Sequence, residues 1–224
     1  MGLKKLIGRT YLRLSGWKAV GPVPDFSTRN YIQVSTPHTS NLDFWVGLMV
    51  FWAYGARPLI LIKKEAFKGI KGWFLRRMGA IPVDRQGSSR GLIQQLRKIF
   101  SEETGRLLVI TPEGTRKRGG NWKTGFYFLS RACKVDILLG WVNYRDKEAA
   151  FGELFTPTGD KPRDFAFIRD YYAQKPAIGR YPEQGHQELW PEGEGLDRPE
   201  FADPFAFNKR SAQKAKPEKE ALES

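Results

Sequence analysis

His38 and Asp43 are the residues of this chain whose types and spacing best suit chemistry. Imidazole is the only side chain whose ordinary pKa, about 6.5, lets it accept and return a proton near neutral pH. An aspartate about one helical turn away can accept a hydrogen bond from the other ring nitrogen and fix the tautomer. The pair is therefore a candidate general base with its orienting carboxylate.

The same stretch also has a purely structural interpretation. Thr39, Ser40, Asn41 and Asp43 stand just ahead of or within the start of an apolar helical pattern. Such residues commonly cap helices by accepting hydrogen bonds from unpaired backbone N–H groups. Both interpretations stay open on these residues alone, and the choice depends on what other segments place around the pair.

The composition indicates an anionic partner. The 224 residues include 37 Lys and Arg against 24 Asp and Glu, which gives a formal charge of +13. Nucleic acid, an anionic membrane surface and an acidic carrier protein all meet this requirement. Seven Trp residues favour the membrane interface, and no zinc-finger or aromatic RNA-binding signature accompanies the basic residues.

Two single residues carry less information. Cys133 is the only cysteine, so no intrachain disulfide can form, which is typical of a reducing compartment. Its apolar helical context predicts a buried thiol and not a nucleophile. The second histidine, His186, lies in a segment rich in Gly and Pro, and we expect it to be exposed.

The first helix is predicted at residues 3–14, where apolar residues recur at helical spacing between lysines and arginines. Such a basic amphipathic helix can lie in the plane of an anionic membrane, or it can pack on the domain with a solvated charged face. Residues 63–78 are the densest basic and aromatic region. That region fits nucleic acid as well as a lipid surface.

Strand and helix patterns alternate from residue 31 to residue 142, which predicts an α/β fold with a central, largely parallel mixed sheet flanked by helices. The expected strands are 31–35, 59–62, 80–83, 106–110, 135–142 and 149–155, and the expected helices are 43–54, 65–78, 90–100, 125–133 and 164–172. We divide the chain into an N-terminal helical extension (1–24), a central domain (25–175) and an extended C-terminal segment and tail (176–224).

The apolar run at residues 44–62 has the length of a transmembrane helix. Gly55, Arg57 and Pro58 interrupt it in the middle. We therefore predict a helix, a turn and a strand instead of a membrane span.

Polar clusters follow three of the predicted strands, at residues 38–43, 84–85 and 113–116. The carboxyl ends of parallel strands meet at one edge of a sheet, where ligands usually bind. A base with its carboxylate, together with Arg85 and Arg116, suits an alcohol substrate that carries a phosphate.

These clusters also resemble the motifs of the glycerolipid acyltransferases, a family that includes glycerol-3-phosphate and lysophosphatidic acid acyltransferases. Residues 38–43 match the first motif, His followed by four residues and Asp; residues 79–85 are similar to the second, and residues 113–116 match the third, Glu-Gly-Thr-Arg. The resemblance covers about residues 30–145. The fourth motif departs from the pattern, because residues 135–140 lack the usual proline.

The resemblance implies that His38 deprotonates an acceptor hydroxyl, which attacks a thioester carbonyl, while Asp43 orients the imidazole. It implies that acceptor phosphate or head-group binding involves Arg85, Glu113, Gly114, Thr115 and Arg116. Glu113 is unusual beside an anion, and bracing the loop suits it better. Backbone N–H groups near Asn41 or Gly114 could stabilise the oxyanion.

The same resemblance implies no metal and no other cofactor, with acyl-CoA or acyl-acyl carrier protein (acyl-ACP) as co-substrate. The acceptor would be a lysophospholipid or glycerol phosphate, and the enzyme would lie peripherally on the cytoplasmic face of an anionic membrane.

A non-enzymatic basic protein that binds membranes or nucleic acid is the alternative, which explains the charge but not the three motifs. A hydrolase that uses the same base on water is a second alternative.

Overall fold

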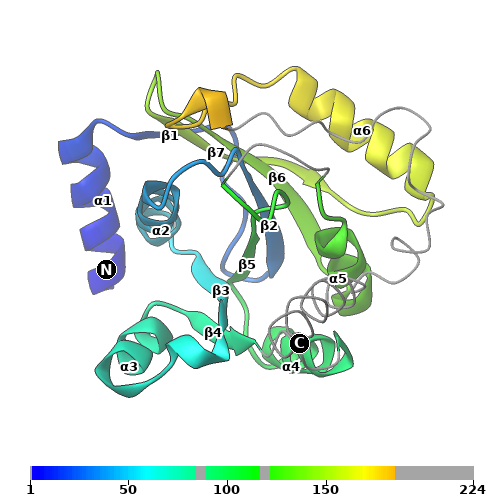
Figure 1. Ribbon diagram of the computed structural model, residues 1–224, viewed down its shortest axis with the longest axis horizontal. Helices are drawn as coiled ribbons and strands as arrows, with labels where there is room; N and C mark the ends of the chain where they lie inside the picture. The colour runs from blue at the N-terminus through cyan, green and yellow to red at the C-terminus, as the bar shows by residue number, and fades with distance from the viewer. Residues whose placement is uncertain (1, 84–88, 117–121, 185–224) are drawn as a thin grey trace, which may run out of the picture.

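The central feature of the fold is one mixed sheet. The computed structural model describes residues 2–83, 89–116 and 122–184. Within these ranges seven strands form a sheet in the order β1-β7-β6-β2-β5-β3-β4, with helices on both faces (Figure 1). Neighbouring strands are parallel except β6 and β7. The predicted α/β fold with a largely parallel sheet is confirmed.

The elements follow one another in the alternation that the sequence predicts. In chain order they are α1 (Leu3–Ser15), β1 (Lys18–Val20), β2 (Tyr31–Thr36), α2 (Leu42–Ala53), β3 (Arg57–Lys63), η1 (Lys64–Ala66), α3 (Gly69–Arg77), β4 (Ala80–Val83), α4 (Ser89–Glu102), β5 (Arg106–Ile110), α5 (Gly125–Cys133), β6 (Asp136–Asn143), β7 (Glu148–Phe155), α6 (Lys161–Ala173) and η2 (Pro182–Gln184).

Two elements differ from the sequence prediction. Strand β1 was not expected, because three residues are too few to show an alternating pattern. It pairs in parallel with β7, so the N-terminal segment contributes an edge strand as well as a helix. The single helix expected at 65–78 is split into η1 and α3, since Gly69, the first residue of α3, has a left-handed φ of 54° that interrupts a continuous helix.

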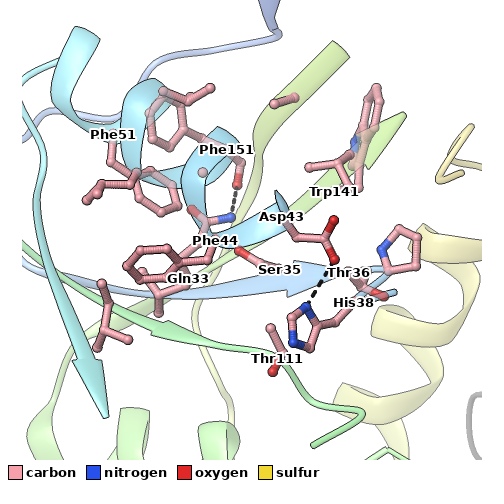
Figure 2. Close-up of a pocket in the computed structure, with 18 of the residues that line it drawn as sticks. Gln33, Ser35, Thr36, His38, Asp43, Phe44, Phe51, Thr111, Trp141 and Phe151 are labelled. Carbon is pink, nitrogen blue, oxygen red and sulfur yellow. Dashed lines mark hydrogen bonds and ion pairs between the residues drawn. The ribbon is translucent and has the colours of Figure 1, made fainter. Parts of the chain in front are cut away.

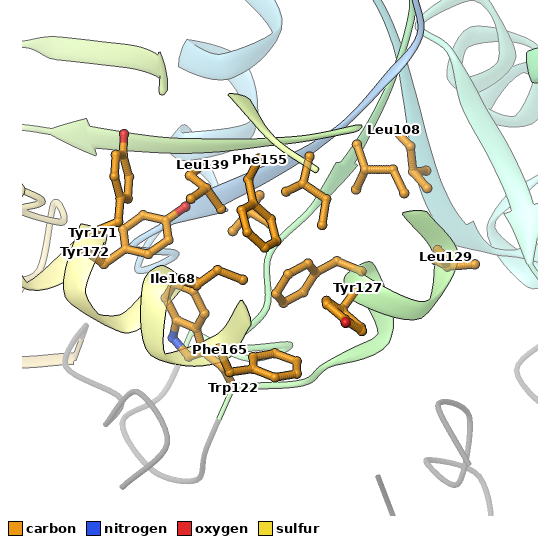
Figure 3. Packing of buried hydrophobic residues seen from close by; sticks show 14 of the residues in the cluster. Leu108, Trp122, Tyr127, Leu129, Leu139, Phe155, Phe165, Ile168, Tyr171 and Tyr172 are labelled. Carbon is orange, nitrogen blue, oxygen red and sulfur yellow. The ribbon is translucent and has the colours of Figure 1, made fainter. Parts of the chain in front are cut away.

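The side of the sheet covered by α4, α5 and α6 carries the larger core (Figure 3). Successive residues of a strand point to opposite faces, and Ile32 and Val34 of β2 both point to this side. They meet Leu96 of α4, Phe126 of α5 and Ile168 of α6, all fully buried. This layer holds β2 and β5 firmly, and both strands lead into predicted site residues.

Helix α2 covers the other face and is almost entirely apolar. Helix α1 crosses it at close range: a Cβ on Gly8 would come within 2.5 Å of the Ala53 nitrogen and the Met49 oxygen. Only glycine permits this crossing, so one face of α1 packs on the domain. Other apolar side chains of α1 remain exposed, among them Leu3 and Leu14.

Helix α2 ends at Ala53 and β3 begins at Arg57, so the predicted helix, turn and strand are confirmed, although the strand begins two residues earlier than expected and includes Pro58. Among the described residues, no helix combines the length and apolar content needed to cross a bilayer.

Candidate active site

His38 and Asp43 form a hydrogen-bonded pair where β2 ends and α2 begins. His38 Nδ1 lies 3.1 Å from Asp43 Oδ2, and the two side chains are 23% and 11% exposed. Since a carboxylate can only accept, this contact places the proton of a neutral imidazole on Nδ1. Nε2 is then the nitrogen with a lone pair, as a general base requires.

Asp43 also stabilises the loop between β2 and α2 by accepting hydrogen bonds from its backbone. Its Oδ2 accepts hydrogen bonds from the backbone N–H groups of Thr39 and Ser40, both at 2.8 Å. Ser40 Oγ in turn accepts from the N–H of Leu42 at 3.0 Å, so it caps the first turn of α2. Capping and the His-Asp pair therefore occur together in the same six residues.

The environment of Asp43 favours its charged form. Burial by itself would raise the pKa of Asp43, but hydrogen bonds from His38, Tyr144 and the backbone of Ser40 and Thr39 outweigh it and lower the pKa below its ordinary value of 3.8. An Asp43 that is ionised at neutral pH is the partner that a histidine needs when it takes up a proton.

Tyr144 is the residue of this cluster that the sequence did not reveal. It lies in the turn between β6 and β7, and its hydroxyl donates to Asp43 Oδ1 at 2.6 Å. It is 101 positions from Asp43 in the chain, and no motif surrounds it. Only the fold brings the two residues together.

Glu113 forms a hydrogen bond with the backbone of the His38 loop. It follows β5, which pairs directly with β2, and its side chain is only 4% exposed. Its Oε1 accepts from Thr36 Oγ1 at 2.5 Å and from the backbone N–H of His38 at 3.2 Å. Burial raises the pKa of Glu113 above its ordinary value of 4.5, although these hydrogen bonds oppose the rise.

The remainder of the third motif turns toward the same loop. Gly114 has a φ of 63°, which L-residues other than glycine rarely adopt, and Arg116 Nη1 donates to Asn41 Oδ1 at 2.5 Å. Thr115 and Arg116 are exposed. The first and third motifs are thus in direct contact at adjacent strand ends.

The hydrogen bonds of this loop narrow the backbone donors expected near Asn41 or Gly114. The N–H of Gly114 donates to the carbonyl of Thr111 at 3.1 Å, so it is not available to an oxyanion. At the amino end of α2 the N–H groups of Thr39, Ser40, Leu42 and Asp43 also donate within the loop, so the N–H of Asn41 is the candidate there.

Arg85, the other predicted cation, lies outside the described residues. Strand β4, which precedes it, is separated from β5 by β3. Two other cations lie near the site and were not predicted. The side chain of Lys123 lies against Gly114, and Arg180 belongs to a segment whose Tyr181 N–H donates to Thr39 Oγ1 at 3.3 Å.

A cavity of about 370 Å³ extends from the His38–Asp43 pair into the space between α2 and the sheet. Figure 2 shows His38 and Thr111 near one end, and Phe51 with Phe151 near the other. The polar lining consists of the residues around the pair and of Gln33 and Ser35 in β2. The rest of the wall is apolar and comes from α2, β3, β5, β6 and β7. Its size and character suit a hydrocarbon chain.

Strand β6 contributes to this cavity although it lacks the expected proline. Trp141 and Val142 line it. Gly140 lets the buried amide of Gln33 pass over β6, where its Nε2 donates to the carbonyl of Phe151 at 3.2 Å. A Cβ on Gly140 would overlap that amide, so a small residue is needed here.

The comparisons with known proteins agree with this geometry. A sequence profile of the family described as Acyltransferase matches residues 23–139, just over half of the chain. The chain therefore belongs to the acyltransferase family.

Two relatives are more specific. Over 113 residues the chain is 31% identical to the 1-acyl-sn-glycerol-3-phosphate acyltransferase of Streptococcus pneumoniae, and the match covers 49% of this chain but only 40% of that protein. The crystal structure of the 1-acyl-sn-glycerophosphate (LPA) acyltransferase PlsC from Thermotoga maritima is similar with a TM-score of 0.54 and 15% identity, over 75% of this chain and 74% of that one. The second match supports the fold.

The lowered pKa of Asp43 makes a prediction about acid stability. Because its folded-state pKa lies below the ordinary 3.8, Asp43 stabilises the fold above that value and loses this effect as the pH falls through the folded-state pKa. The gap in unfolding free energy between wild type and Asp43→Asn should therefore shrink on acidification. Urea titrations between about pH 3 and pH 7, followed by tryptophan fluorescence, measure it. Asp170→Asn, which removes an exposed carboxylate of α6, controls for net charge; a constant gap for Asp43→Asn would contradict the prediction.

Proposed function

We propose that this protein transfers a fatty acyl group from a thioester donor to a hydroxyl of a lysophosphatidate-like acceptor. The observation that carries the proposal is the position of the His38–Asp43 pair at the end of an apolar cavity between α2 and the sheet. An apolar cavity next to a base can hold an acyl chain with its thioester carbonyl beside the base, which can then activate an acceptor hydroxyl. The family and the pneumococcal relative support the same reaction.

In this mechanism His38 Nε2 accepts the proton of the acceptor hydroxyl as its oxygen attacks the thioester carbonyl. Asp43 stabilises the resulting imidazolium through Nδ1. We assign the oxyanion to the backbone N–H of Asn41 at the amino end of α2, because the neighbouring N–H groups of Thr39, Ser40, Leu42 and Asp43 donate within the loop. The tetrahedral intermediate then collapses, the carbon–sulfur bond breaks, and the thiolate leaves with the proton from His38. We assign Glu113 the task of holding the His38 backbone, because its buried carboxylate accepts that N–H.

The acceptor's phosphate would lie against the exposed side of the third motif. Arg116 is exposed, and its contact with Asn41 places its guanidinium beside the His38 loop. A guanidinium is permanently charged and matches phosphate oxygens with two parallel donors. Gly114 and Thr115 shape the same loop, and Arg85 is proposed as a second cation on the strength of its motif alone.

The donor would be acyl-CoA or acyl-ACP. Both are anionic thioesters, and both suit a chain with a formal charge of +13. The acyl chain would occupy the cavity beside Phe44 and Phe51, with the thioester carbonyl next to His38.

We also propose that α1 and α3 dock the protein peripherally on an anionic membrane, at its cytoplasmic face. Ile70, Trp73 and Phe74 of α3 are 87%, 63% and 47% exposed. Lysines and arginines flank them, and Lys4 Nζ of α1 donates to the carbonyl of Arg77 at the end of α3. This contact joins the two helices, and each exposes apolar and basic side chains of the kind that anionic interfaces attract.

Replacing the base should abolish acyl transfer. We expect His38→Ala to lose at least about 10²–10⁴-fold in rate, the usual contribution of a general base, while unfolding cooperatively like the wild type. Thiol release from acyl-CoA and from acyl-ACP, measured with lysophosphatidate present, gives the rate, and mass spectrometry identifies the lipid. His186→Ala is the matched control. Near-normal thiol release by His38→Ala would exclude this mechanism, and free fatty acid as the only product would indicate hydrolysis.

Replacing Arg116 should affect the acceptor more than the donor. We expect Arg116→Ala to raise the KM for lysophosphatidate by about tenfold or more, the equivalent of one charge-assisted hydrogen bond, with little change in the KM for the thioester. Steady-state kinetics with each substrate varied in turn measures both constants. Arg163→Ala, an exposed arginine of α6, is the control. Equal changes in the two constants would argue against a phosphate-binding role.

Removing the exposed apolar residues of α3 should weaken membrane binding. We expect Ile70→Ser combined with Trp73→Ser to lower affinity for phosphatidylglycerol-containing vesicles at least about tenfold, because each buried apolar side chain contributes about 1.5–3 kcal/mol. Co-sedimentation with vesicles of phosphatidylglycerol and phosphatidylcholine measures it. Phe167→Ser, which removes an exposed aromatic from α6, is the control. Unchanged binding, or stronger retention on duplex DNA at physiological salt, would contradict this docking surface.

A further inference from the structure

We propose that Tyr144 is a positioning residue for acyl transfer, which holds Asp43 so that Asp43 can hold His38. The proposal rests on the proposed function, since it assigns Tyr144 a task in that reaction. It follows from the arrangement of hydrogen bonds around one carboxylate.

The two oxygens of Asp43 have separate partners. Oδ2 receives His38 Nδ1 and the N–H groups of Thr39 and Ser40, all from the loop to which Asp43 itself belongs. Oδ1 receives the hydroxyl of Tyr144, which comes from the turn between β6 and β7. Among the hydrogen bonds of Asp43 in the described residues, this one alone ties the carboxylate to a distant part of the chain. It prevents rotation of the carboxylate plane that the local contacts on Oδ2 leave possible.

Tyr144 is itself held on several sides. Its N–H donates to the carbonyl of Ile178 at 2.9 Å. Asn143, fully buried, accepts from the N–H groups of Arg145 and Asp146 and so stiffens the turn. Trp17 packs its ring edge-on against that of Tyr144, with centroids 4.9 Å apart. A hydroxyl held this firmly costs little to align when the reaction begins.

The groups that face Tyr144 favour its role as a donor. Asp43 lies on one side, and Tyr11 of α1 and Arg180 of the C-terminal segment are its other ionisable neighbours. Burial, and then the hydrogen bond to Asp43, raise the pKa of Tyr144 well above its ordinary value of 10.0. Its hydroxyl is therefore protonated at neutral pH, and it can only donate to an ionised Asp43.

A purely structural role for Tyr144 makes a different prediction. The turn that carries it also joins the N-terminal segment, because Lys147 Nζ donates to the carbonyl of Ser15 and Trp17 packs on the Tyr144 ring. If the hydroxyl served only to hold this turn, its loss would lower stability and leave the chemistry of the folded protein unchanged. Tyr144→Phe separates the two roles, because it keeps the ring and its packing.

The matched control is Tyr127→Phe. Tyr127 also donates a hydroxyl to an aspartate, Asp164 Oδ2, at 2.8 Å, but it does so between α5 and α6. We expect Tyr144→Phe to lower kcat by about tenfold to a hundredfold, the rate equivalent of one hydrogen bond to a charged group, with both KM values unchanged. Tyr127→Phe should leave kcat unchanged. Equal kcat values for wild type and Tyr144→Phe would overturn the proposal.

A second measurement does not depend on turnover. The chain has only two histidines, so ¹⁵N spectra of a His186→Gln background report on His38 alone. Under conditions in which the imidazole is neutral, we expect one tautomer, protonated on Nδ1, and a mixture of tautomers once Tyr144→Phe is added. A single unchanged tautomer would overturn the proposal. Absence of acyl transfer by the wild type would refute the proposed function, whereas the tautomer measurement would still decide whether Tyr144 positions Asp43 and His38.

Discussion

The carboxylate of Asp43 is the constraint on which the site depends. A charge that is largely removed from water is stable only when donors satisfy it, and here two backbone N–H groups, an imidazole and a phenol do so. The donors come from different parts of the site. The two backbone groups belong to the loop before α2, His38 lies at the cavity, and Tyr144 belongs to the turn between β6 and β7. The residue that orients the proposed base is thus also the residue that holds the loop together.

The sheet supplies the second requirement, which is the contact between the first and third motifs. Strands β2 and β5 are parallel neighbours, so the segments that follow them emerge side by side. Glu113 then reaches the backbone of His38, and Arg116 reaches Asn41. Helix α2 completes the site, because its first turn begins at the loop and its apolar face forms one wall of the cavity. The amino end of α2 therefore lies beside the proposed reacting groups, and its apolar residues line the space proposed for the acyl chain.

Much of the fold was predictable from local patterns. The strands at 80–83 and 106–110 and the helix at 125–133 were predicted to the residue. Sequence patterns failed where the structure depends on strand pairing or on the backbone conformation of a single residue. Strand β1 is too short to alternate, and it exists because β7 offers it an edge. Helix α3 begins late because of the conformation of a single glycine, Gly69. The need for glycine at position 140 is clear only from the fold, because the side-chain amide of Gln33 occupies the space that a Cβ would take.

The sequence by itself determined the residues that could do chemistry and their order along the chain. His38, Asp43 and the 113–116 motif are local features, and spacing within a loop or turn is fixed by covalent geometry. Only the tertiary structure decided that Tyr144 meets Asp43, that Glu113 is buried beneath His38 instead of facing solvent, and that α2 leaves a cavity next to the base. These contacts join residues up to 101 positions apart, and such distances are set by strand order and packing, which no local spacing encodes.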